Sequence, residues 1–237
     1  MRRRLIGLAA RCAWILLPAL VCGAAQAARP LVTEDAGVLG RGDCELEGVA
    51  GRTSRSGPGE TTALLQVACG VGLQTQLAGA FGTSRTEGES SLAAAATGKT
   101  WLRELTDDQA GVALAYAFAG GRPSGMGWRY GSTTLLGVVT VPLQKEWLLH
   151  ANLGASHSRP DRETTAICAA AVEVLQVGGS AFDLMAETFG TQRDPPWVNA
   201  GVRYTVVPER FTINASYGAQ GGSGRERLAT VGFKLNF

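Results

Sequence analysis

The sequence predicts an all-β chain that forms a transmembrane, antiparallel, up-and-down β-barrel of twelve strands. Three observations predict this fold. Apolar and polar residues alternate with a period of two, the alternating segments are mostly about 9–13 residues long, and the connections alternate between long and short. A tilted strand needs about 9–11 residues to cross a bilayer, and outer-membrane barrels join their strands by long outside loops and short periplasmic turns.

The alternation is clearest near the end of the chain. Within 227–237, one face carries Thr230, Lys234 and Asn236, and the other face is apolar. The apolar residues are Ala229, Val231, Phe233, Leu235 and Phe237. This period is typical of a strand with one apolar face, not of a helix. The same reading predicts twelve strands, at 43–54, 61–70, 73–84, 92–104, 110–118, 131–141, 146–156, 164–175, 180–189, 197–206, 210–218 and 227–237.

The connections give the barrel an orientation. Each odd-numbered connection is longer than its neighbours: 55–60, 85–91, 119–130, 157–163, 190–196 and 219–226. We therefore expect these loops outside the cell, and both chain ends in the periplasm because the strand count is even. Loop 119–130 is the longest, and whether it folds inward as a constriction stays open.

The first residues are typical of a secretory leader. Three arginines precede a mostly apolar stretch, and Ala25-Gln26-Ala27 is a small-residue cleavage site. We expect residues 1–27 to be a signal peptide cleaved after Ala27. A lipid anchor on Cys22 is less favoured because Val21 is bulky where a small residue is required. We then expect a periplasmic segment at 28–42 and an outer-membrane barrel at 43–237.

Composition excludes several other classes of protein. The chain is 45% hydrophobic with a formal net charge of +2, which excludes disorder and a strongly basic nucleic-acid binder. After the leader, no apolar run approaches the length of a membrane helix. A soluble β-sandwich or a lipocalin-like barrel would also alternate, but its core face would be apolar where this chain carries charges.

Two cysteines lie opposite each other in the predicted first hairpin. If 43–54 pairs with 61–70 around loop 55–60, Cys44 comes within disulfide reach of Cys69. Export places both in an oxidising compartment, so we expect the disulfide. Cys168 shares an apolar face with Ala166 and Ala170, which predicts a lipid-facing position.

The polar face is the candidate functional surface, because in a membrane barrel the apolar face meets lipid. The register places Asp183 opposite Arg203, which predicts a cross-strand ion pair. The candidate lumen residues are Lys99, Arg103, His150, Asn152, Glu173, Asp183, Glu187, Asn199, Arg203, Asn214 and Lys234. Further polar residues on this face are Glu45, Glu47, Gln66, Gln74, Gln76, Thr212 and Asn236.

These side chains have two interpretations. They line a narrow, selective channel, or they pair with one another and fill a closed structural barrel. No segment has the pattern of a plug, and small residues such as Ala78, Ala80 and Ala115 leave space inside. Both facts favour the channel.

Enzymatic activity has little support in the sequence. Some outer-membrane barrels are lipid hydrolases with a Ser–His pair, and the base must reach the serine. His157 and Ser158 are adjacent, so in a strand they point to opposite faces. His150 has no serine two residues on, although a serine on a neighbouring strand remains open. We find no metal-ligand spacing and no phosphate-binding loop, and we expect no cofactor.

Aromatic residues at strand ends fit the interfacial girdles of membrane barrels. Those expected at the periplasmic side are Trp101, Trp147, Phe211 and Phe237, and those expected at the outer rim are Trp128 and Tyr130.

Several short segments resemble the outer-membrane barrel family named for the meta-pathway of phenol degradation. They are 29–35 (RPLVTED), 44–47 (CELE), 186–190 (AETFG), 201–208 (GVRYTVVP), 214–218 (NASYG) and the ending from Gly232 to Phe237. Members of that family often occur in pathways for aromatic compounds and are regarded as transporters. The resemblance implies the barrel fold and passage of a small aromatic or hydrophobic solute. It carries over no catalytic residue.

The sequence thus predicts passive passage of a small solute through the outer membrane of a Gram-negative bacterium. The expected partners are outer-membrane lipid, the solute and the outer-membrane assembly machinery. The strand that ends at Phe237 resembles the signal that this machinery binds. No nucleic-acid partner is expected. The alternatives are a non-conducting structural barrel and a lipid hydrolase.

Overall fold

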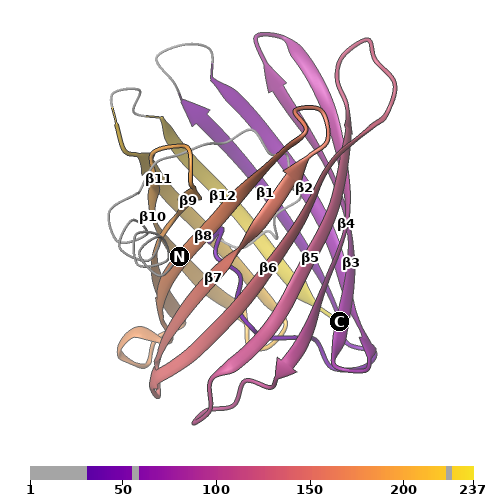
Figure 1. Cartoon of the computed structure of the whole chain (residues 1–237). Helices are drawn as coiled ribbons and strands as arrows, with labels where there is room; N and C mark the ends of the chain where they lie inside the picture. The colour runs from indigo at the N-terminus through magenta and orange to yellow at the C-terminus, as the bar shows by residue number, and fades with distance from the viewer. Residues whose placement is uncertain (1–30, 55–58, 223–225) are drawn as a thin grey trace, which may run out of the picture.

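The computed structural model describes residues 31–54, 59–222 and 226–237, which form a closed antiparallel barrel (Figure 1). The strands are β1 (Cys44–Ser54), β2 (Glu60–Gly72), β3 (Thr75–Thr86), β4 (Glu89–Arg103), β5 (Gly111–Arg122), β6 (Arg129–Gln144), β7 (Trp147–Ser158), β8 (Glu163–Val174), β9 (Phe182–Thr191), β10 (Trp197–Val207), β11 (Phe211–Gln220) and β12 (Arg227–Asn236). Each strand pairs with its neighbours in sequence, and β1 pairs with β12 to close the ring. The predicted twelve-stranded, all-β barrel is confirmed.

Helical structure is minimal in the described part of the chain. One short 3-10 turn, Val177–Gly179, connects β8 to β9. No described helix is long and apolar enough to cross a membrane. The predicted leader, 1–27, lies outside the described residues, as do 28–30, 55–58 and 223–225.

The two faces of the wall differ as the alternation predicts. On β7, Leu153 is 66% exposed on the outside, whereas its neighbour Asn152 is 5% exposed on the inside. Other exposed apolar side chains include Leu65, Val198 and Val231. The buried set instead contains charged residues, Glu47 and Lys99 among them. An apolar exterior around a polar interior is the arrangement of a barrel that lipid surrounds.

The first hairpin is closed by the predicted disulfide. Cys44 and Cys69 are register partners on β1 and β2, with 4.2 Å between their Cα atoms, and their sulfur atoms are bonded. Cys168 lies on the outer face of β8 and is exposed, as expected.

The connection lengths differ from the prediction. We call the end with Cys44 and Phe237 the terminal end, and the opposite end the loop end. At the loop end, residues 87 and 88 alone join β3 to β4, and β5 and β6 extend until only 123–128 separates them. At the terminal end, 104–110 and 175–181 are longer than expected. The strict alternation was therefore wrong, because the β3–β4 and β5–β6 hairpins continue pairing into the expected loops.

The described part of the segment expected in the periplasm lies elsewhere. Residues 31–39, which we call the lumen strap, run inside the barrel (the indigo trace in Figure 1). Ala36 is fully buried and Thr33 is 2% exposed. Residues 40–43 then follow the end of β2, where the Gly42 N–H donates to the Gly70 carbonyl over 2.9 Å. The expectation of a lumen without a plug is therefore corrected.

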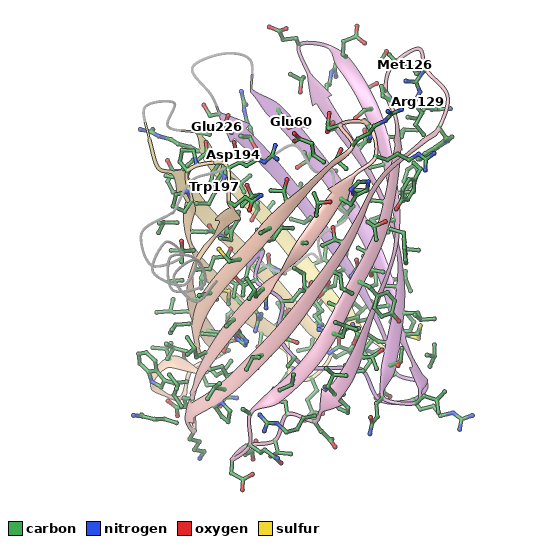
Figure 2. All side chains as sticks on the ribbon, in the orientation of Figure 1. Glu60, Met126, Arg129, Asp194, Trp197 and Glu226 are labelled. Carbon is green, nitrogen blue, oxygen red and sulfur yellow. A yellow bond between two sulfur atoms is a disulfide. The ribbon has the colours of Figure 1, made fainter. Side chains whose placement is uncertain are left out.

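Two tryptophans point inward. Trp101, expected in an interfacial girdle, instead packs beside Ala36 and donates from Nε1 to the Ala36 carbonyl over 2.5 Å. Trp197 is 1% exposed and stacks on Phe189 towards the loop end (Figure 2). By contrast, Trp147 and Phe237 at the terminal end are exposed, as are Trp128 and Tyr130 at the loop end.

Candidate functional site

The candidate site is the contact between the lumen strap and the inner wall. The strap forms neither helix nor strand, and wall side chains from five strands hold it. These strands are β3, β4, β6, β7 and β9. Because successive residues of a strand alternate between faces, only every second residue of each strand reaches the strap.

Glu187 of β9 holds the beginning of the strap. Its carboxylate accepts hydrogen bonds from the main-chain N–H of Val32 (2.9 Å) and of Thr33 (2.8 Å), and from the Thr33 hydroxyl (2.7 Å). Asn199 of β10 donates from Nδ2 to the same carboxylate over 2.8 Å. Glu187 is 4% exposed, and a buried carboxylate is stable only with such donors around it.

Asn152 of β7 binds the middle of the strap through two hydrogen bonds. Its Oδ1 accepts from the Glu34 N–H over 2.7 Å, and its Nδ2 donates to the Glu34 carbonyl over 2.9 Å. Farther along, the Ala36 N–H donates to the Thr140 hydroxyl oxygen of β6 (2.8 Å), and the Leu39 N–H donates to Gln76 Oε1 of β3 (2.9 Å). These side chains satisfy strap main-chain groups that would otherwise be buried without partners.

Lys99 of β4 brings a positive charge to the strap. Its Nζ lies 2.9 Å from the Asp35 carbonyl oxygen, 3.2 Å from Asp35 Oδ1 and 3.4 Å from Glu34 Oε2. The Lys99 side chain is 4% exposed, whereas the Glu34 and Asp35 side chains are each 26% exposed. An ammonium this deeply buried requires such anionic partners.

A second charged cluster lies on the wall at β6, β7, β8, β9 and β10. His150 Nδ1 is 2.9 Å from the Thr140 hydroxyl, and His150 Nε2 is 3.3 Å from Glu173. Arg203 donates to Glu173 over 2.5 Å and to Asp183 over 3.2 Å. Asp183 and Arg203 are register partners, so the predicted cross-strand ion pair is present.

A third group joins β12 to β1. Lys234 forms an ion pair with Glu45 and lies 3.5 Å from Glu47, whose side chain is fully buried. Asn214, also predicted inside, is 7% exposed on β11.

One predicted lumen residue lies apart from the others. Arg103 is exposed at the last position of β4. A bulge between Trp101 and Arg103 shifts the register there, which ends the regular alternation that predicted an inward side chain. The prediction that Arg103 lines the lumen is therefore corrected.

Several residues of the site were not predicted. The strap residues lack any periodicity, and Thr140 is an ordinary residue of a valine-rich strand. The inward position of Trp101 could have been predicted, because Trp101 lies two positions from Lys99 in the same strand and therefore shares its face.

The histidines do not form a Ser–His pair in the described contacts. The Thr140 hydroxyl meets His150, and this hydroxyl also receives the Ala36 N–H of the strap. His157 is exposed and lies 3.0 Å from Thr164, while Ser158 donates to Asp161. Within the part of the chain that the structure describes, no group of three His, Cys, Asp or Glu residues is arranged to hold a metal ion.

Comparison with protein families settles membership. The model of the family described as "Uncharacterised conserved protein UCP029691" matches residues 15–237. The chain belongs to this family. No curated protein matches the chain significantly.

Solved structures of outer-membrane barrels are similar in fold. A COG4313 outer membrane channel from Pseudomonas putida F1 has a TM-score of 0.60 at 9% identity, with 86% of this chain and 98% of that chain covered. The KdgM porin has a TM-score of 0.57 at 8% identity, with coverage of 81% and 99%. Outer membrane phospholipase A from Escherichia coli has a TM-score of 0.52 at 11% identity, with coverage of 81% and 92%. At these identities the likeness shows the fold alone.

Proposed function

We propose that this protein is an outer-membrane channel for small polar solutes, and that the lumen strap closes it in the position observed. The observation that carries the proposal is how the strap is held. Its contacts at residues 32–36 run to wall side chains rather than to the strand ladders. Because β1 to β12 pair around the full ring independently of residues 32–36, the strap can leave the lumen without opening the wall.

Two alternatives have less support. A structural barrel filled by the side chains of its own wall needs no further chain segment inside, yet here residues 31–39 lie within the lumen. A lipid hydrolase needs a nucleophile that lipid can reach, whereas Thr140 and His150 are 0% and 2% exposed on the inner wall. One barrel of similar fold is a phospholipase, so activity toward lipids is a direct control in any assay.

The chemistry of the wall supports a polar solute. The buried wall residues include five carboxylates, Glu45, Glu47, Glu173, Asp183 and Glu187, together with several amides and hydroxyls. An aromatic or hydrophobic solute follows only from the resemblance to the phenol meta-pathway family. The KdgM porin has also been solved in complex with disordered oligogalacturonate, a polar molecule.

The cellular setting follows from the same proposal. We place the barrel in the outer membrane of a Gram-negative bacterium with its terminal end in the periplasm, and we assign residues 1–27 as a leader cleaved after Ala27. Outer-membrane lipid then surrounds the wall, and the strand ending at Phe237 is the segment we expect the assembly machinery to bind.

Single-channel recording of the full-length mature protein in planar bilayers tests the function. The strap is fixed in place by a second disulfide, in the variant Ala36→Cys/Ala113→Cys on a Cys168→Ala background. Ala36 and Ala113 belong to one buried cluster, and we expect cysteines at these two positions to come within disulfide reach. We expect discrete conductance steps from the parent protein and loss of most openings after the double variant is oxidised.

The matched control is the oxidised single variant Ala36→Cys on the same background, which should conduct like the parent. Inserted protein that never conducts would exclude the channel. Equal conductance of the cross-linked and single variants would show that the strap is not the gate.

A further inference from the structure

Three consecutive strap residues are held as a peptide, through their main chain. The Thr33 N–H donates to Glu187 over 2.8 Å. The Glu34 N–H donates to Asn152 Oδ1 over 2.7 Å, and the Glu34 carbonyl accepts from Asn152 Nδ2 over 2.9 Å. The Asp35 carbonyl accepts from Lys99 over 2.9 Å. Any chain of three amino acids presents the same groups in the same order.

The charges of the wall match the two ends of a free tripeptide. Glu187 lies where the first nitrogen binds, and in a free peptide that nitrogen is an ammonium group. Lys99 lies where the third carbonyl binds, and in a free tripeptide that group is a carboxylate. At Glu187, a peptide ammonium would add a second charge to hydrogen bonds in which only the carboxylate is ionised. At Lys99, the peptide carboxylate would take the place of the Glu34 and Asp35 carboxylates.

We propose that Glu187, Asn152 and Lys99 form a binding site for short linear peptides, which the strap occupies in the closed state. The peptide ammonium binds Glu187, the middle residue binds Asn152 through its N–H and carbonyl, and the terminal carboxylate binds Lys99. The inference rests on the proposed function, since the strap must leave before a solute enters. It names the class of solute: zwitterionic tripeptides and peptides of similar length.

The position of Asn152 between two opposite charges is what favours a peptide over other small polar solutes. A carboxamide that accepts from one N–H and donates to the carbonyl of the same residue recognises an amino acid within a chain. Neighbouring hydroxyls of a neutral sugar can also donate to and accept from one carboxamide, but such a sugar carries neither an ammonium for Glu187 nor a carboxylate for Lys99. A hydrophobic solute offers no partner at all. Glu187 and Lys99, which are 4% and 3% exposed, then add opposite charges on either side of the Asn152 contact.

The strap competes with a free peptide for these three residues. It is part of the same chain, so its effective concentration at the site is high, on the order of millimolar. A tripeptide gains an ion pair at Glu187, where the strap offers only uncharged donors, whereas at Lys99 its carboxylate replaces the Glu34 and Asp35 carboxylates. The gain at Glu187 offsets part of the strap's advantage. Binding of peptide therefore favours the open state.

Uptake into proteoliposomes that contain the full-length mature protein tests the site. Three probes of nearly equal size are trialanine, N-acetyl-trialanine, which lacks the ammonium, and trialanine amide, which lacks the carboxylate. We expect trialanine to enter about tenfold faster than either blocked peptide at concentrations below saturation, because each blocked peptide keeps a hydrogen bond at its blocked end but loses the ion pair there.

Two variants that each remove one charge test which wall residue binds which end of the peptide. Lys99→Gln should abolish the preference for trialanine over trialanine amide and keep the preference over N-acetyl-trialanine. Glu187→Gln should do the reverse. Lys145→Gln, which removes a lysine from the exposed β6–β7 turn, should keep both preferences. If neither variant folds, the three probes on the unaltered protein still decide the question.

The outcomes separate the inference from the function it rests on. Ion conductance with equal entry of all three probes overturns the peptide site and leaves the channel. The absence of both conductance and saturable trialanine binding in detergent overturns both. Preference for trialanine that survives in both Lys99→Gln and Glu187→Gln places peptide recognition elsewhere and overturns the assignment of these residues.

Discussion

Arg203 of β10 reaches past its neighbouring strand to Glu173 of β8, with 2.5 Å between Nη1 and Oε1. On the way it pairs with Asp183 of β9, so one guanidinium joins three consecutive strands. His150 of β7 extends the cluster by its contact with Glu173. Since the two carboxylates are nearly buried, they depend on Arg203 for their charge balance.

Arg203→Met should therefore destabilise the barrel, because it leaves Glu173 and Asp183 without their shared cation. We expect a loss of about 2 kcal/mol in the free energy of unfolding, a moderate value because the Arg203 side chain is 22% exposed. Urea unfolding in detergent micelles measures it. The double variant Arg203→Met/Glu173→Gln should recover part of the loss. No change in either variant would contradict the proposed role of the cluster.

Gly70→Ala should displace the end of the lumen strap at residues 39–40. A Cβ at residue 70 would lie 2.0 Å from the Gly40 carbonyl oxygen, so the main chain of residues 39–40 must move. We expect more frequent channel openings, and a loss of about 1–3 kcal/mol in stability, as for other overpacked sites. Single-channel recording and urea unfolding measure the two effects.

Gly79→Ala is the matched control for that substitution. Gly79 lies on neighbouring β3, and a Cβ there would have no atom within 4 Å. Its openings and stability should equal those of the parent. If Gly70→Ala also behaves like the parent, the close approach of Gly40 to β2 does not hold the strap.

The channel should prefer cations. Five carboxylates are buried in the wall. Three lysine or arginine side chains, Lys99, Arg203 and Lys234, pair with carboxylates inside the described part of the barrel, and His150 contacts Glu173 there. Acidic linings favour cations in pores. We expect the potassium-to-chloride permeability ratio, from reversal potentials in a salt gradient, to exceed one. Glu45→Gln/Glu47→Gln should lower it, whereas Glu146→Gln in an exposed turn should not. A preference for chloride would show that these carboxylates do not face the ion path.

Removal of the disulfide should weaken the first hairpin. Cys44 and Cys69 are 25 residues apart in sequence, and a loop of that size stabilises by about 3 kcal/mol on the chain-entropy model. Cys44→Ser/Cys69→Ser should lose about that much in urea unfolding. Reduction of the parent protein should reproduce the loss, and reduction of the double variant should add nothing further. Equal stability of the oxidised parent and the double variant would mean that the bond does not constrain the unfolded chain.

The strands and the disulfide could be predicted because both depend on local patterns. A period of two fixes which residues share a face, and the hairpin register then brings Cys44 to Cys69 and Asp183 to Arg203. The inward position predicted for Arg103 was wrong because a bulge interrupts the period of two just before this residue.

The strap could not be predicted in the same way. The contact of Thr33 with Glu187 joins residues 154 positions apart, and that of Ala36 with Thr140 joins residues 104 positions apart. Neither partner has a pattern that refers to the other. The wall residues alone were predictable as an inward polar face, and what they bind depends on a segment without periodicity.

The lumen strap also fixes an order of events during folding. It is translated before every strand of the barrel, yet its partners lie on β3, β4, β6, β7 and β9. None of these side chains is in position until the wall around them has paired, and contacts so distant in sequence form slowly. The strap precedes every strand in the chain, and we expect it to take its place only after the wall from β3 to β9 has paired.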